Sequence, residues 1–129
     1  MRTLTLIALA ALVASPTSMA QNVHPADGSP NGGSMVTAEE IHKELAYNGV
    51  DPTKLTTIQM MGGLYASGYV LGVADSFNND VICIPAGVSK QEIFAVVGKY
   101  LNEHPSGWHN PAPVEISVAL HISYPCKAG

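Results

Sequence analysis

An uncharged stretch of twenty residues, 55–74, most constrains what this chain can fold into. Its apolar content and its length predict one long helix. Four glycines lie inside it: Gly62, Gly63, Gly68 and Gly72. Each glycine costs roughly 1 kcal/mol relative to alanine in a helix interior, so the helix must recover that free energy through tertiary contacts. We therefore expect a central helix onto which other parts of the backbone pack closely.

Side-chain spacing defines two faces on this helix. Apolar and aromatic residues at three- and four-residue steps form one face: Ile58, Met61, Tyr65, Tyr69, Val73 and Phe77. Gly68 and Gly72 lie one turn apart on an adjoining face, a spacing that lets two helices approach closely, so they could serve packing within the domain or the seam of a homodimer. A membrane span is the alternative for this stretch. Its threonines and tyrosines dilute the apolar content and no basic flank follows, so we expect no span.

The first twenty residues have the features of an export signal. Arg2 provides a positive start, residues 4–13 an apolar core and residues 18–20 a small-residue cleavage site. The residues that follow are rich in Gly, Pro, Asn and Ser and are typical of a flexible segment. We therefore expect a signal peptide over 1–20, a flexible leader over 21–35 and one folded domain over 36–129.

The charge of the exported chain excludes some classes of partner. Removal of Arg2 leaves five Lys and Arg residues against ten Asp and Glu residues, a net charge of −5, and the basic residues are scattered. Nucleic acid and anionic membrane surfaces are therefore poor partners for this protein.

Cys83 and Cys126 are the only cysteines. Two thiols tend to pair in the oxidising compartment that an exported chain reaches, so we expect a disulfide between them. It would close a loop of 44 residues, for which the loop-entropy model gives about 4 kcal/mol of stabilisation. The alternative is a free nucleophilic Cys83, but no histidine lies near it in a catalytic pattern.

Local signals predict two more helices. Two segments have the capping-box spacing that marks a helix start: Thr37 with Glu40, and Ser89 with Glu92. We expect a short first helix that ends at residues 48–49 and an amphipathic helix that ends at residues 104–105. In residues 115–124, by contrast, apolar residues alternate with small or polar ones, and this local pattern favours a β-strand. A helix beginning near Pro111 and Pro113 is the alternative there.

Residues that could carry chemistry are few. The five histidines have no spacing typical of metal ligands, and the chain contains no phosphate loop or nucleophile elbow. Asp75 is the most isolated acid; we expect it at an exposed helix end, the alternative being a buried acid with a perturbed pKa that serves an enzyme. We predict no enzymatic activity, cofactor or metal.

The only tryptophan lies in a loop bounded by proline and glycine. An aromatic side chain in such a loop is either tucked onto the core or presented to a partner. The candidate partner-contacting residues of this chain are therefore Glu103, His104, Trp108 and His109.

Four sequence blocks carry a family resemblance: GYVLGVAD at 68–75, CIP with GV at 83–88, VGKYLNEHP at 97–105, and AL with YPC at 119–126. Their order and spacing, over roughly residues 57–126, resemble the Rap/Tai family of type VI secretion amidase immunity proteins. The resemblance implies an all-α domain of about four helices, with a helix in place of the strand at 115–124. Family members commonly carry a further cysteine where this chain has Ala66, together with a partner in the first helix. Without that pair, we expect the first helix to be held by packing alone.

The resemblance also implies a function. It predicts a periplasmic, often dimeric immunity protein that binds and inhibits a papain-like peptidoglycan amidase effector delivered by type VI secretion. The alternative is an envelope-accessory binding module of the same fold with no toxin partner, because a fold supports function only by analogy.

Overall fold

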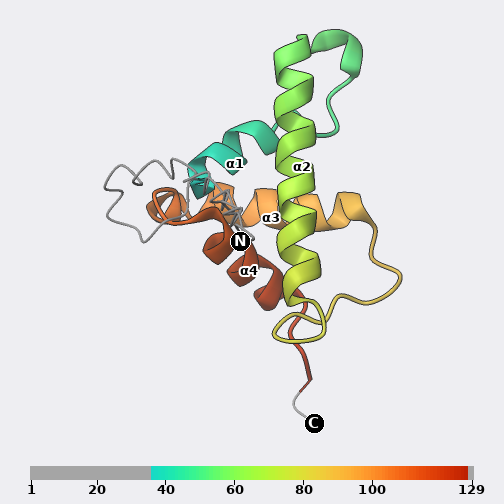
Figure 1. The fold of residues 1–129 in the computed structure, drawn as a ribbon, viewed down its shortest axis with the longest axis vertical. Helices are drawn as coiled ribbons and strands as arrows, with labels where there is room; N and C mark the ends of the chain where they lie inside the picture. The colour runs from blue at the N-terminus through green and yellow to red at the C-terminus, as the bar shows by residue number, and fades with distance from the viewer. Residues whose placement is uncertain (1–35, 128–129) are drawn as a thin grey trace, which may run out of the picture.

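The computed structural model describes residues 36–127. This part of the chain contains four α-helices and two short 3-10 helices joined by loops (Figure 1). They are α1 (Ala38–Leu45), η1 (Pro52–Lys54), α2 (Thr57–Phe77), α3 (Lys90–Glu103), η2 (Pro105–Gly107) and α4 (Ala112–Ser123). These residues form isolated β-bridges but no strand, so the predicted all-α fold of about four helices is confirmed. The expected signal peptide (1–20) and leader (21–35) lie outside the described residues.

Helix α1 begins at the predicted capping residue and is closed by a second segment of the chain. The Thr37 hydroxyl accepts a hydrogen bond from the Glu40 amide at 3.3 Å. The amides of Ala38 and Glu39, which have no partner within the helix, donate to carbonyls of residues 108–110 at 3.0 Å each. The expectation that packing alone holds this helix is therefore wrong, because hydrogen bonds to a distant loop hold its start. After the helix the chain turns at Gly49, whose φ of 84° lies in the region that favours glycine.

Helix α2 is the longest element, and its N-terminal end extends beyond the other helices toward η1 (Figure 1). A complete capping box between Thr56 and Gln59 starts it. Its buried residues are small or β-branched and face the other three helices: Gly63, Ala66, Val70, Val73 and Ala74. The apolar face that begins at Ile58 is buried only toward its C-terminal end, since Ile58, Met61 and Tyr65 are 81%, 65% and 44% exposed. Described residues 36–127 contain no helix long and apolar enough to cross a membrane.

The glycines of α2 divide into two pairs. A Cβ at Gly62 would collide with the Glu44 carboxylate, and a Cβ at Gly63 would lie 3.3 Å from the Tyr47 Cβ. A Cβ at Gly68 or Gly72 would meet nothing within 4 Å. The expected close approach of another backbone segment therefore holds at Gly63, which lies against Tyr47 and Asn48 in the turn after α1, whereas Gly62 meets only the Glu44 side chain. It does not hold for Gly68 and Gly72, which no other segment of residues 36–127 approaches closely.

Helices α3 and α4 complete the core. The predicted capping box of α3 is present in full, with the Ser89 amide donating to Glu92 at 2.7 Å. Helix α4 replaces the strand that local alternation favours. Its buried positions follow a helical period, and the alternation fails as a guide because Val118 and Ile122 face solvent. The largest fully buried side chains come from every α-helix and from one loop: Ile41, Val70, Ile82, Val97, Leu101, Ile116 and Leu120.

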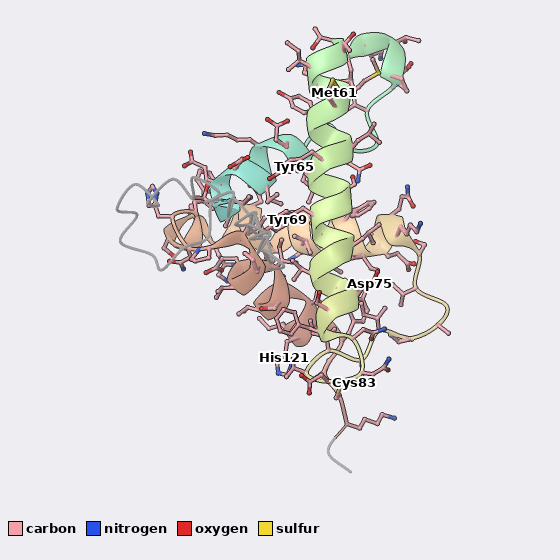
Figure 2. The ribbon with its side chains drawn as sticks, viewed as in Figure 1. Met61, Tyr65, Tyr69, Asp75, Cys83 and His121 are labelled. Carbon is pink, nitrogen blue, oxygen red and sulfur yellow. A yellow bond between two sulfur atoms is a disulfide. The ribbon has the colours of Figure 1, made fainter. Side chains whose placement is uncertain are left out.

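The predicted disulfide joins Cys83 to Cys126, with 4.8 Å between their Cα atoms. It ties the connection between α2 and α3 to the segment after α4. The Cys83 amide also donates to the Tyr124 carbonyl at 2.8 Å, and His121 Nδ1 is hydrogen-bonded to the Val81 carbonyl at 2.7 Å. Figure 2 shows His121 and Cys83 together at this end of the molecule. The free-thiol alternative for Cys83 is therefore wrong.

Candidate partner-binding surface

The loop between α3 and α4, residues 104–111, connects the ends of three helices. Its carbonyls at Trp108 and Asn110 accept the two α1 amides described above. In return, the Ala112 amide at the start of α4 donates to the Val36 carbonyl at 2.9 Å. Thr37 and Pro111 form an antiparallel bridge at the same place. The loop is thus held by backbone hydrogen bonds on both sides, although it contains no long regular element.

Trp108 is tucked against the helices and is half-buried. Its indole N–H donates to the Leu101 carbonyl in the last turn of α3 at 2.8 Å. Its ring stacks on His42 of α1, with 4.8 Å between the ring centroids. Trp108 is therefore packed onto the core, as the first of the two alternatives states, and only part of its ring is accessible to a partner.

The other three candidate residues are exposed around Trp108. Glu103 forms an ion pair with Lys99 at 2.5 Å. His104 stacks on Tyr100, with 4.1 Å between the centroids, and its Nδ1 is hydrogen-bonded to the Tyr100 carbonyl at 2.8 Å. His109 lies on the α1 side of the loop, near Glu39. The hydrogen bond from Lys43 is the main cause of the lowered pKa of Glu39, and the charge of His109 lowers it further. The four predicted residues thus lie together: Glu103 ends α3, and the other three belong to the loop that follows it.

Beneath this loop lies Glu115, the one buried charged residue of the described chain, at 7% exposure. Asn110 Nδ2 donates to Glu115 Oε1 at 2.6 Å. Burial raises the pKa of the Tyr100 hydroxyl, and the charge of Glu115 and its hydrogen bond with Tyr100 raise it further. Sequence reasoning did not single out Glu115: local alternation put it at the start of a strand, and the family resemblance put it in a helix without giving it a role. The available signal was an acid alone among the apolar residues of 111–124.

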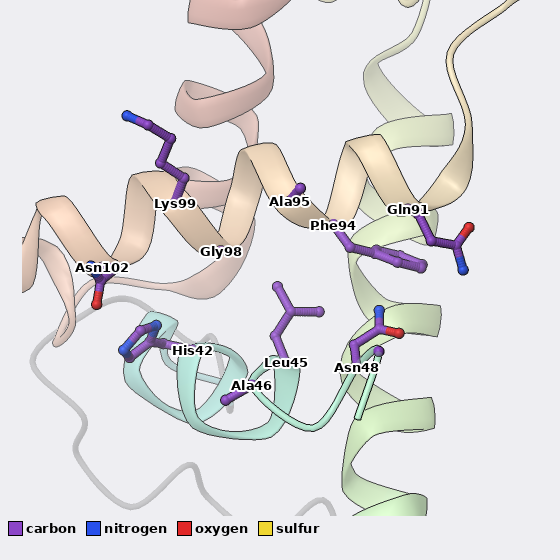
Figure 3. A pocket seen from close by; sticks show the side chains of 11 residues that line it. His42, Leu45, Ala46, Asn48, Gln91, Phe94, Ala95, Gly98, Lys99 and Asn102 are labelled. Atoms are coloured by element: carbon purple, nitrogen blue, oxygen red, sulfur yellow. The ribbon is translucent and has the colours of Figure 1, made fainter. Parts of the chain in front are cut away.

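A groove of about 490 Å³ runs between α1 and α3 beside the loop (Figure 3). Leu45 and Phe94 provide apolar surface, and His42, which stacks on Trp108, belongs to the lining. The remaining polar side chains of the lining are mostly amides: Asn48, Gln91, Lys99 and Asn102. The groove therefore meets the loop at His42, and Lys99 is the only Lys, Arg, Asp or Glu in its lining.

A second surface follows the outward side of α2. Exposed residues recur there at three- and four-residue steps: Ile58, Met61, Tyr65, Gly68 and Gly72. Met61 and Tyr65 both lie on the N-terminal half of α2 (Figure 2). Asp75 is exposed near the end of the helix, so the buried-acid alternative for it is wrong.

The described residues lack the grouping that metal chemistry needs, because no three His, Cys, Asp or Glu side chains of residues 36–127 could hold an ion together. Residues 36–127 form a small helical fold closed by one disulfide. The family model of the Rap1a immunity proteins matches residues 44–126, more than half of the chain. The chain belongs to this family, as its sequence blocks predict. A comparison with curated proteins finds no match.

Proposed function

We propose that this immunity protein acts in the periplasm, where it binds and inhibits a peptidoglycan amidase effector of a type VI secretion system without catalysing a reaction itself. Membership of the Rap1a immunity family carries the proposal. Immunity requires the chain to recognise a toxin, and it can inhibit that toxin by binding alone, without breaking a bond of its partner.

Two features support the periplasm as the place of action. The Cys83–Cys126 disulfide is typical of a protein that matures in an oxidising compartment. Residues 1–20 have the composition of a cleavable export signal. We therefore propose the division into a signal peptide over 1–20, a leader over 21–35 and an immunity domain over 36–129.

Glu103, His104, Trp108 and His109 are the proposed toxin-contacting residues. A loop already fixed to three helix ends loses little conformational entropy when it binds, so more of its contact energy appears as affinity. The adjoining groove would extend the contact, since amide side chains can donate to and accept from a polypeptide backbone. Such a surface would plug the cleft of the amidase rather than react with it.

The exposed face of α2 is the proposed seam of a homodimer. No other segment of the described chain lies close to Gly68 or Gly72, and small residues one turn apart allow two helices to approach closely. The neighbouring Ile58, Met61 and Tyr65 would add apolar contact area.

Affinity capture followed by an inhibition assay tests the toxin assignment. The purified exported chain is used to capture proteins from the secreted fractions of the producing strain and of its competitors. We expect recovery of a hydrolase that releases muropeptides from isolated peptidoglycan, and loss of that activity when the chain is added in equimolar amount. Recovery of no hydrolase, or of one that stays active when bound, would contradict the proposal.

Matched variants locate the contact surface. Glu103→Ala and His109→Ala should weaken binding of the captured amidase, by more than about 1 kcal/mol where the side chain is a central anchor. Asp80→Ala serves as the control, because Asp80 is equally exposed but lies in the connection between α2 and α3. Equal effects of all three changes would argue against the loop as the contact surface.

A further inference from the structure

The buried carboxylate of Glu115 has no role in the proposed contact with a toxin. Its side chain is almost fully buried, in a core otherwise made of apolar residues. A buried carboxylate is costly unless it is hydrogen-bonded, so a residue of this type needs a specific environment. That environment is the underside of the loop between α3 and α4.

Three groups surround the carboxylate. Asn110 donates its side-chain amide to Oε1 at 2.6 Å, and the Tyr100 hydroxyl on α3 lies close enough for the charge of Glu115 to raise its pKa, although burial is the main cause of that shift. Gly107 closes the third side, since a Cβ at this residue would lie 2.8 Å from Glu115 Cδ and Oε2. Glu115 itself stands in the first turn of α4, where the positive end of the helix dipole favours a negative charge.

These contacts lead directly to the exposed surface. Asn110, held by Glu115 through its side chain, accepts the Ala38 amide through its carbonyl. Gly107 accepts the Asn110 amide at 2.9 Å and precedes Trp108 in the chain. The position of the carboxylate thus sets the path of residues 107–110, on which the half-buried tryptophan and the exposed His109 are carried.

We infer that Glu115 is a positioning residue: its buried carboxylate fixes the conformation of the 104–111 loop and so determines the shape that the partner-binding surface presents. It acts through Asn110, Gly107 and Tyr100 and does not touch the partner. The consequence for toxin recognition rests on the proposed function, whereas the consequence for the loop does not.

Two substitutions with side chains of similar length distinguish the role of the carboxylate oxygens as hydrogen-bond acceptors from the role of side-chain volume. Glu115→Met keeps an unbranched chain but removes every acceptor, which leaves the Asn110 amide unpaired. Glu115→Gln removes the charge but keeps one acceptor oxygen for Asn110. Leu120→Ala is the control: it lies further along α4, is fully buried, and should lower global stability without acting on the loop.

The readouts are local to the loop. Hydrogen exchange of the Ala38, Glu39 and Asn110 amides reports the bonds that the loop makes and receives. The fluorescence of Trp108, the only tryptophan, reports its packing. In Glu115→Met we expect exchange of these amides to rise about tenfold or more relative to core amides of α3, with red-shifted emission. Glu115→Gln should restore most of both signals.

An unchanged loop in a folded Glu115→Met protein would overturn the inference, and so would an equal change in Leu120→Ala. If Glu115→Met does not fold, Asn110→Ala removes the donor alone and should produce the same local loosening; a tight loop in that variant would also overturn it. None of these readouts involves a toxin. A loop that loosens in a protein for which no amidase is found would contradict the proposed function and leave the role of Glu115 intact.

Discussion

The indole N–H of Trp108 donates to the carbonyl of Leu101 across 2.8 Å, so the only tryptophan of the chain closes the end of α3. The carbonyls in the last turn of a helix have no partner within it. Trp108 satisfies one of them with its side chain, while its own carbonyl accepts the Glu39 amide of α1. One residue of the proposed toxin-contacting loop therefore joins two helices whose sequences lie far apart.

Trp108→Phe should destabilise the protein by about 1 kcal/mol, because the ring can still stack on His42 while the hydrogen bond to Leu101 is lost. Urea unfolding followed by circular dichroism measures the change. Ser106→Ala, an exposed substitution in the same loop, is the control and should stay within about 0.5 kcal/mol of the wild type. A Phe variant as stable as the wild type would show that the indole N–H contributes nothing net.

Reduction of the Cys83–Cys126 disulfide should lower the free energy of unfolding by up to about 4 kcal/mol, because the bond closes a long loop in the unfolded chain. Urea unfolding with and without dithiothreitol measures this change. In the Cys83→Ser/Cys126→Ser protein the reductant should have no effect, and the stability should match that of the reduced wild type. An unfolding midpoint insensitive to reductant in the wild type would contradict the prediction.

The predictable parts of this fold are those set by neighbours in sequence. The Ser89–Glu92 capping box and the Thr37 half of the first predicted cap depend on a few adjacent residues, and the pairing of the only two cysteines left one choice. The prediction places the end of α1 too late, at residues 48–49, whereas the helix stops at Leu45. The buried face of α2 was not predictable, because the other helices cover its small residues and leave Ile58 in solvent. The burial of Glu115 could not be predicted either, because it depends on the contact between Gly107 and α4, which only the folded structure brings about.

Acid should destabilise the protein through its capping carboxylates. The hydrogen bonds from the Ser89 amide and hydroxyl hold the pKa of Glu92 below its usual 4.5, and hydrogen bonds from Thr53 lower the pKa of Asp51 in the same way. A carboxyl group whose pKa is lower in the folded than in the unfolded state contributes stability that is complete above the unfolded value. This contribution is lost as the pH falls through the folded value.

The melting temperature should therefore be level from pH 7 to about pH 5 and should fall between about pH 5 and pH 3. Glu92→Gln keeps a hydrogen-bonding side chain but cannot titrate, so its melting temperature should fall less steeply over the same range. A series of thermal melts by circular dichroism provides the measurement. Identical slopes for the two proteins would mean that Glu92 has the same pKa in the folded and unfolded states.

Substitutions at the glycines of α2 test packing within one domain independently of the proposed dimer. Gly68→Ala and Gly72→Ala should each stabilise the monomer by up to about 1 kcal/mol, because alanine is the better helix former and the new methyl group meets no atom within 4 Å. Gly63→Ala should gain at least about 0.5 kcal/mol less than either, since its methyl group would press on Tyr47. Urea unfolding at low protein concentration gives the three values.

A larger side chain at the same two positions tests the seam. If two copies of α2 pack across this face, Gly68→Leu and Gly72→Leu would hold the helices apart, and sedimentation should show the dimer dissociating at concentrations where the wild type stays paired. Circular dichroism confirms that the variants remain folded, as expected for residues with open space around them. Val118→Leu, on the exposed side of α4, is the control and should leave the association unchanged. A dimer that survives both glycine substitutions would place its interface elsewhere on the molecule.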